Sequence, residues 1–334
     1  MHLLVENAAL YSLSIREFMN LRLIQIAAAQ KVSRVIWSLG GQKQFIGKSI
    51  PVLSYHRVLP GFIEKDTPMY SVLPEQFAEQ MEYLSSNGFD SLSLDEYEQI
   101  VKGEKDVPER SILITFDDGY VDFYSQALPI AKQYGIKLNI FVCTGLVEGS
   151  AAEIYPEIPA HAGEHQAAFP ELWRALNWDE IRQLKAEGVG IGFHGHSHRK
   201  LAQMTIEEIA LEFELGLSLY HQETNDEMRH FAFPHGTYDS YDNERVALIS
   251  NLGMQLQFST RLSRTPVDAK EALISRLVIH QEDDLETYQL KLFGAYEWLG
   301  ALRHWNQKRK YTSVSQENQT VVRSVPEKAI GESK

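Results

Sequence analysis

The sequence contains one cysteine among its 334 residues, so no disulfide bond can form within the chain. Cys143 lies in the apolar run 138–144, where we expect a small buried thiol without redox chemistry. The sequence also lacks the roughly 18 to 20 consecutive apolar residues that span a bilayer. Its first twenty residues lack the basic start and apolar stretch of a secretion signal. From these absences we expect a cytoplasmic protein that does not cross a membrane.

Positive charge is scarce in this chain. It has 32 Lys and Arg residues against 45 Asp and Glu residues, which gives a formal net charge of −13. A nucleic-acid-binding surface needs clustered basic residues to neutralise phosphates, so this balance predicts that nucleic acid is not a partner. With 44% hydrophobic and 23% charged residues, the composition is that of an ordinary globular protein with a sizeable core.

The amino-terminal segment differs from this acidic background. It has no acidic residue between Glu17 and Glu64, and apolar residues recur at helical spacing from about residue 14 to 38. This pattern predicts one amphipathic helix, which ends at Gly40 and Gly41. A basic amphipathic helix could pack on its own domain or lie on an anionic membrane surface, so peripheral membrane contact is one of two interpretations.

From Pro51 onward, short apolar segments alternate with helical patterns. The expected strands are 52–55, 112–116, 138–143, 189–193, 231–233, 256–259 and 277–279, and the expected helices are 74–87, 93–101, 120–134, 177–188 and 205–220, with an irregular stretch over 147–172. Strands that alternate with helices predict a parallel sheet, either open or closed as a (β/α) barrel. We expect a helical extension over 1–48, one α/β domain over 49–300 and a disordered tail over 301–334.

Two groups of polar residues directly follow expected strands. Asp117 and Asp118 come after one strand, and His194 and His198 come after another. Ligands of parallel α/β folds gather beyond the carboxyl ends of the strands, so we expect these side chains to meet a substrate there. A structural interpretation stays open for the two carboxylates, because either of them could cap the helix that follows.

The spacing of the two histidines favours a metal site. Four residues apart on a helical turn, His194 and His198 present their imidazoles on one side, whereas His196 points elsewhere. Two neutral imidazoles with one carboxylate suit zinc best, and three protein ligands leave a position open for water. His161 and His165 have the same spacing, but they lie in the irregular stretch, so we expect them to be loop residues.

Three motifs resemble those of the polysaccharide deacetylase family, also called carbohydrate esterase family 4, whose shared unit is the NodB homology domain. They are Thr-Phe-Asp-Asp-Gly-Tyr at 115–120, His-Gly-His-Ser-His at 194–198 and Phe-Ala-Phe-Pro-His-Gly at 231–236. The resemblance covers roughly residues 50–285, and Tyr55 and His56 resemble the first strand of one branch of the family. It implies a distorted (β/α) barrel of about seven parallel strands, with 49–300 as the catalytic domain.

The resemblance also implies roles for single residues. Asp117 is implied as the catalytic base, and the metal ligands are implied to be Asp118, His194 and His198. The metal is a divalent cation, with zinc as the first choice and cobalt or nickel as alternatives. The proton donor to the departing amine is expected to be His56, with His280 as the second choice, although His56 could instead be a core histidine.

The third motif departs from the commoner family pattern, which has an arginine before the proline and an aromatic residue after it. This chain has Phe233 and His235 at those two places. Arg276, beside an expected strand, is therefore the candidate that would orient the catalytic aspartate. The residues expected to line the substrate site are Tyr120, Pro234, Tyr238 and Arg276, whereas the amphipathic pattern around Trp178 favours a place in the core.

The activity implied is metal-dependent hydrolysis of N-acetyl groups on the amino sugars of a polysaccharide, oligosaccharide or glycolipid. Two alternatives stay open, namely a deacylase of the same fold that acts on a formyl or O-acetyl group, and a non-catalytic carbohydrate-binding protein. Asp117 beside Asp118 counts against the binding protein, because a binding module has no need of a general base next to a metal ligand.

Overall fold

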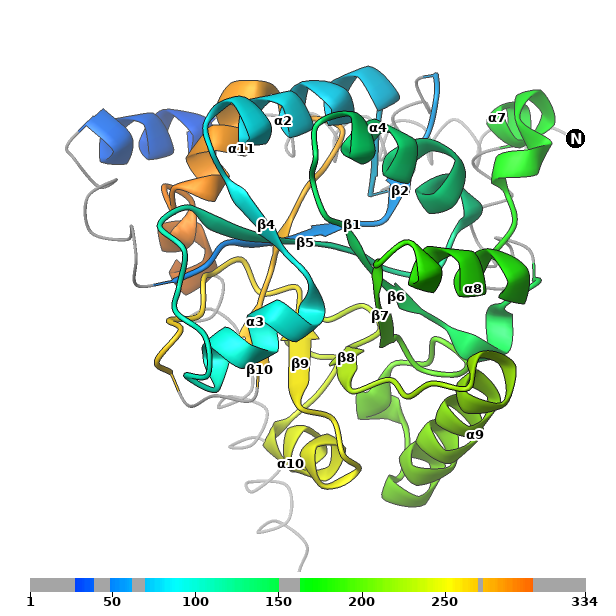
Figure 1. Ribbon diagram of the computed structural model, residues 1–334. Coiled ribbons are helices and arrows are strands. Elements are labelled where there is room, and N and C mark those ends of the chain that lie inside the picture. Colours follow the sequence, from blue (N-terminus) through cyan, green and yellow to red (C-terminus); the bar gives the residue numbers. More distant parts are fainter. Residues whose placement is uncertain (1–27, 39–48, 62–69, 150–162, 270–272, 303–334) are drawn as a thin grey trace, which may run out of the picture.

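The computed structural model describes residues 28–38, 49–61, 70–149, 163–269 and 273–302 (Figure 1). The strands are β1 (Val52–Tyr55), β2 (Arg57–Val58), β3 (Ser71–Val72), β4 (Asp90–Leu92), β5 (Ser111–Phe116), β6 (Asn139–Val142), β7 (Gly190–Phe193), β8 (His230–Ala232), β9 (Leu256–Ser259), β10 (Leu273–Ser275) and β11 (Leu277–Val278). The helices are the segment 28–38, α2 (Pro74–Ser86), α3 (Leu94–Val101), a π-helical turn η2 (Phe123–Ala127) that runs into α4 (Leu128–Gln133), α7 (Gly163–Ala168), α8 (Trp178–Ala186), α9 (Ile206–Thr224), α10 (Asn243–Asn251) and α11 (Leu285–Leu292).

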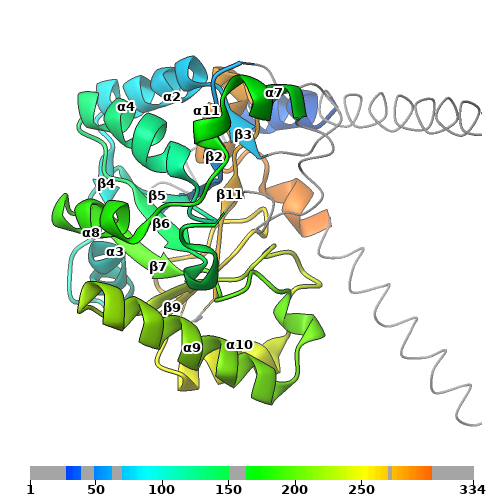
Figure 2. The same ribbon diagram turned by 90° about the vertical axis from the view of Figure 1, so that its right-hand side faces the viewer.

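One parallel sheet curves into a nearly closed barrel with helices around it (Figures 1 and 2). The strand order is β10-β9-β8-β7-β6-β5-β1-β11, and β4 pairs with the first half of β5. Only Arg276 separates β10, which pairs with β9, from β11, which pairs with β1, so a single extended segment joins the two ends of the sheet. If β10 and β11 are counted as one strand, the eight strands of this order make seven. The predicted barrel of about seven parallel strands is therefore confirmed.

Burial on both faces explains why the barrel strands are continuous apolar runs rather than alternating ones. All six residues of β5 are buried, since one face packs on surrounding helices and the other fills the barrel interior. Phe77 and Met81 of α2 belong to the same core cluster as Ile114 and Phe116 of β5. The helix and strand layers therefore share one core beneath the carboxyl edge of the sheet.

Several helices begin with capping boxes that the sequence predicts. Ser93 and Thr205 each accept a hydrogen bond from the amide three residues on, where a glutamate closes the box, and α3 and α9 start there. The irregular stretch 147–172 is partly helical, because α7 and the 3-10 turn η4 (Pro170–Leu172) occupy its described portion.

The helical segment 28–38 packs against α11 through its small residues. Ala29 and Ser33 are buried, and Ser33 Oγ accepts a hydrogen bond of 3.2 Å from the indole of Trp298. Val32 and Val35, two of the apolar residues at helical spacing, are 43% and 57% exposed. Small residues, not these valines, meet the domain.

The remainder of the expected amino-terminal helix and almost all of the expected tail lie outside the described residues. Among the described helices, none combines the length and apolar character that crossing a membrane requires.

Candidate functional site

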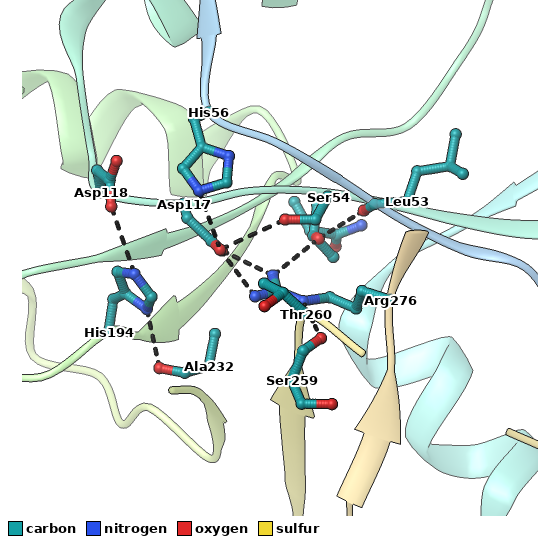
Figure 3. A network of polar contacts seen from close by, with 12 residues as sticks. Leu53, Ser54, His56, Asp117, Asp118, His194, Ala232, Ser259, Thr260 and Arg276 are labelled. Carbon is teal, nitrogen blue, oxygen red and sulfur yellow. Dashed lines mark hydrogen bonds and ion pairs between the residues drawn. The ribbon is translucent and has the colours of Figure 1, made fainter. Parts of the chain in front are cut away.

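The carboxyl ends of the parallel strands bring the site residues together at one edge of the barrel (Figure 3). Tyr55 pairs with Phe116 across β1 and β5, so the residues that follow them, His56 and Asp117, are neighbours. His194 follows Phe193, the last residue of β7, along the same edge. The location predicted from the strand ends is therefore the observed one.

The side chains of Asp118, His194 and His198 form a compact group. The Oδ1 atom of Asp118 lies 3.3 Å from Nε2 of His194 and 3.3 Å from Nε2 of His198. All three side chains are buried. The Nδ1 atom of His194 lies 2.8 Å from the carbonyl oxygen of Ala232, and a proton on that nitrogen leaves the lone pair of Nε2 facing Asp118 (Figure 3).

This group fits a divalent cation. Both carboxylate oxygens of Asp118 are buried, and neither accepts a hydrogen bond from any residue of the described ranges. Since a buried carboxylate without donors is costly, the arrangement favours a cation as the missing partner. Two imidazole nitrogens and one carboxylate oxygen are donors that suit zinc and related transition metals.

Electrostatics in the group favour the ionised carboxylate. Burial alone would raise the pKa of Asp118, but the close imidazoles of His194 and His198 hold it well below its ordinary value. Burial lowers the pKa of His194, and the neighbouring carboxylates of Asp117 and Asp118 outweigh that effect and raise it. The site is therefore prepared to hold positive charge.

Strained backbone brings these side chains together. Asp118 has φ 77°, His198 has φ 58° and the nearby His235 has φ 63°, all in the left-handed region that non-glycine residues rarely adopt. Such conformations cost on the order of 1–3 kcal/mol each and persist where surrounding structure imposes them. Their concentration at this edge is the pattern expected of a functional site.

Glu212 of α9 holds the turn between the two histidines. Its carboxylate accepts hydrogen bonds from the backbone nitrogen of Ser197 at 2.5 Å and from the Ser197 hydroxyl at 2.8 Å. His196 points the other way, with Nδ1 3.2 Å from Oγ1 of Thr144. The predicted divergence of His196 from the metal group is confirmed, whereas the role of Glu212 was not predicted.

Asp117 occupies an environment different from that of Asp118. Its two carboxylate oxygens accept hydrogen bonds of 2.7 Å each from the two terminal nitrogens of Arg276. Arg276 in turn donates 3.1 Å bonds to the carbonyl oxygen of Ser259 and to Oγ1 of Thr115. Burial raises the pKa of Asp117, but Arg276, followed by nearby histidines, outweighs this and lowers it.

Arg276 therefore orients Asp117, as predicted, from the point where β10 gives way to β11. Its side chain is 0% exposed, so the expectation that it also lines the substrate site is wrong. Closure of the barrel and fixation of the carboxylate depend on the same residue.

Of the two candidate proton donors, only His56 lies beside Asp117. The distance from Nε2 of His56 to Oδ2 of Asp117 is 3.9 Å. His280 is on the far side of Tyr70, whose ring lies 4.7 Å from that of His56 and 5.2 Å from that of His280, centroid to centroid. Burial lowers the pKa of His56, and the charges of Asp118 and Asp117 partly offset this. Tyr70 was not predicted.

The residues expected to contact the sugar are less accessible than the sequence indicates. Tyr120 is 1% exposed, and the guanidinium of Arg57 covers its ring at 4.0 Å, so the expectation that Tyr120 lines the substrate site is wrong. Pro234 is buried next to the loop of His194. Tyr238 is half-buried, with the guanidinium of Arg261 4.8 Å from its ring centre.

The second pair of histidines with the same spacing is not a comparable site. His165 lies in α7 rather than in a loop, and its two ring nitrogens contact the carbonyl oxygen of Pro60 at 2.7 Å and the indole of Trp173 at 3.0 Å. His161 lies outside the described residues. Trp178 packs against the main core, as expected.

A second acidic and histidine group lies where β8 begins, at the opposite edge of the sheet. Its members are Asp95, Glu98 and His230. Lys102 and Arg229 already form ion pairs with Glu98 and Asp95. The carboxylates at this edge therefore have cationic partners, unlike Asp118.

Comparisons with known proteins agree with this geometry. A family model described as polysaccharide deacetylase matches residues 104–256, which include the aspartate pair, His194 and His198. YxkH of Bacillus subtilis, whose name assigns it to the polysaccharide deacetylases, is 25% identical over 215 residues, 63% of this chain. The alignment spans 64% of the length of YxkH. A poly-beta-1,6-N-acetyl-D-glucosamine N-deacetylase of Staphylococcus aureus is 25% identical over 264 residues, 73% of this chain and 82% of that one.

Solved structures share the fold. A deacetylase of Streptococcus pyogenes, PplD, solved with acetate, superposes with a TM-score of 0.60 at 21% identity, over 73% of this chain and 98% of that chain. IcaB from Ammonifex degensii superposes with a TM-score of 0.58 at 23% identity, over 74% and 98% of the two chains. This chain is therefore similar to polysaccharide deacetylases over the matched residues 104–256, and it shares the barrel of the two solved structures.

Proposed function

We propose that this chain is a metal-dependent hydrolase that removes N-acetyl groups from the amino sugars of a glycan. The observation that carries the proposal is the division of labour between two adjacent carboxylates. Asp118 faces the two imidazoles of the metal group, whereas Asp117 faces Arg276 and His56. A protein that only bound a sugar would need no second, separately oriented carboxylate at this place.

Asp118, His194 and His198 are the residues that would hold the metal. A divalent cation there would act as a Lewis acid toward the acetamide carbonyl and would make the attacking water more acidic. The buried Asp118 carboxylate and the imidazoles supply the charge and nitrogen donors for it. Zinc is the first choice, and cobalt or nickel could take its place.

Asp117 is the proposed general base. It stays ionised because Arg276 lowers its pKa, and the two hydrogen bonds from the guanidinium fix the plane of the carboxylate. An ionised and rigidly held carboxylate can take a proton from the water as the water attacks the acetamide carbon.

His56 is the proposed donor of a proton to the departing amine. It lies next to Asp117, and burial lowers its pKa, so its protonated form gives up the proton readily. His280 stays the second choice. Separate alanine variants distinguish them, because loss of the donor should lower kcat far more than loss of a neighbouring histidine.

The substrate class follows from relatives and chemistry together. The Staphylococcus aureus relative is named for N-deacetylation of poly-beta-1,6-N-acetyl-D-glucosamine. We therefore propose an N-acetylglucosamine-containing glycan as the substrate of this chain.

The test is acetate release from N-acetylglucosamine oligomers by protein stripped of metal and resupplied with zinc, cobalt or nickel. Wild type should regain activity with metal, and Asp117→Asn should bind the metal but release at least about 100-fold less acetate. Asp118→Asn should lose the metal. Glu98→Gln, which changes the buried acid of the opposite edge, is the matched control and should keep both.

Metal-independent acetate release, or full activity of Asp117→Asn, would refute the proposed mechanism. Metal binding without acetate release, together with formate release or ester hydrolysis, would transfer the assignment to another acyl group.

A further inference from the structure

Arg261 lies at the same edge of the barrel as the candidate site. It comes two residues after Ser259, the end of β9, whose carbonyl oxygen accepts a bond from Arg276 (Figure 3). The intervening Thr260 bonds through its backbone nitrogen to the carbonyl oxygen of Gly236 and through its hydroxyl to that of His235, both at 2.9 Å. A short series of contacts thus joins Arg261 to the metal group.

The last contact in this series reaches a metal ligand. The ring of His235 lies 5.1 Å from the ring of His198, centroid to centroid, and His235 itself is exposed. Arg261 therefore directly follows the residue that bonds to the His235 loop, on the β8–β9 side of the metal group.

The surroundings of Arg261 differ from those of the neighbouring arginines. Arg264 pairs with Glu297 at 2.7 Å, and Arg276 pairs with Asp117 at 2.7 Å. Within the described part of the chain, no carboxylate forms an ion pair with Arg261, and its buried Nε has no hydrogen-bond partner. Arg261 lacks a carboxylate partner there even though the chain has 45 acidic residues against 32 basic ones.

Two tyrosine rings hold the Arg261 side chain instead. Its guanidinium carbon lies 4.8 Å from the ring centre of Tyr238 and 5.1 Å from that of Tyr241. Cation–π contacts fix the plane of a guanidinium without neutralising its charge or using up its N–H donors. The half-buried Arg261 is therefore a preorganised cationic fork with donors to spare.

We infer that Arg261, held by Tyr238 and Tyr241, forms a subsite for an anionic group on the sugar next to the one that is deacetylated. A planar guanidinium fork matches the two oxygens of a carboxylate or a phosphate, which are the two groups that could supply the charge. The inference rests on the proposed function, and it narrows the substrate to an acidic N-acetylated glycan.

The experiment compares three matched disaccharides in which the second sugar is neutral, is a hexuronic acid or carries a phosphate. Wild type should show a lower KM for one or both acidic disaccharides. A charged hydrogen bond contributes about 1.5–3 kcal/mol, so Arg261→Met should raise that KM about 10- to 100-fold, with kcat and the neutral KM unchanged. Arg261→Lys should give a KM for the acidic disaccharide between those of wild type and Arg261→Met. Arg264→Met should keep the wild-type preference among the three disaccharides.

The outcomes separate the inference from the proposed function. Preference for the hexuronic acid or for the phosphate identifies which group supplies the charge. An equal rise in KM for all three disaccharides in Arg261→Met would overturn the inference. So would a wild type that shows no preference for an acidic disaccharide. Should no disaccharide be hydrolysed, the proposed function fails, and dissociation constants of the same three ligands for wild type and Arg261→Met still decide whether the subsite exists.

Discussion

Replacing Arg276 should move the pH dependence of the reaction, because Arg276 is what keeps Asp117 ionised. Arg276→Met keeps the aliphatic bulk and removes both 2.7 Å bonds to the carboxylate. Burial, the largest effect on the Asp117 pKa, is then opposed by the nearby histidines and by the hydrogen bond from the Ser54 hydroxyl, without the guanidinium charge. The pKa of Asp117 should therefore rise.

The same change should destabilise the fold. Removing one partner of a buried ion pair costs about 3–5 kcal/mol, because the other charge stays buried without compensation. For a domain of this size, that corresponds to a fall in Tm of about 6 °C or more. The sign of the pH effect also reverses. An acid whose folded-state pKa is raised favours folding at low pH, so the Tm of Arg276→Met should fall as pH rises through that pKa.

The assay is kcat/KM for acetate release against pH, with Tm measured in the same buffers. The acidic limb of the profile should move to higher pH in Arg276→Met, because Asp117 must be ionised to act as a base. Arg276→Lys keeps the charge and should show a smaller shift. Arg264→Met removes another arginine from a carboxylate contact and should lower Tm without moving the limb. An unmoved limb in a folded Arg276→Met protein would refute the assignment of Asp117 as the base.

Three further predictions concern the supporting structure. Glu212→Ala should weaken metal binding about 10- to 100-fold in competition with a chelator, because it removes both acceptor bonds to Ser197; unchanged affinity would contradict this role. Gly216→Ala should cost about 1–3 kcal/mol in urea unfolding, because the new Cβ would lie 2.5 Å from the Phe193 ring, and a neutral result would mean that α9 can move away. Burial alone would raise the pKa of Glu96, but its hydrogen bonds from lysines and from the backbone lower that pKa to about 2. The ionised Glu96 therefore stabilises the fold above pH 4.5, and this stabilisation is lost as the pH falls toward 2. The Glu96 side chain is about a quarter exposed, so Glu96→Gln should lower the free energy of unfolding by about 1 kcal/mol at pH 7 and by less at pH 3. An equal loss at both pH values would contradict this prediction.

Local signals made the barrel predictable, and their absence explains the elements that were missed. The long apolar run of β5 and the capping boxes of α3 and α9 are visible in a few consecutive residues. Helices α10 and α11 start at Asp242 and Asp284 without the glutamate that completes a capping box, and neither was predicted. Strands β4 and β10 have three residues each, which is too short for a periodic pattern.

The site divides in the same way. Asp118 and the two histidines are predictable because motifs and strand ends mark them. Tyr70 and Glu212 gain their places from residues brought to them by the fold, and nothing adjacent in the sequence distinguishes them. Arg276 is 159 residues from Asp117, and only its position beside an expected strand suggested the contact. Tyr120 was expected to line the substrate site because the sequence does not show that Arg57 covers its ring.

The left-handed backbone at Asp118, His198 and His235 has a consequence for the evolution of this protein. Each of the three makes the folded state less stable than a relaxed turn would, on the order of 1–3 kcal/mol. Laboratory selection for heat resistance alone should therefore favour glycine or asparagine at these positions, and at Asp118 and His198 such variants would lose a proposed metal ligand. Of the three, only His235 lies outside the proposed ligand group and can change with that group intact. Selection for both heat resistance and activity should therefore place its other substitutions far from this edge.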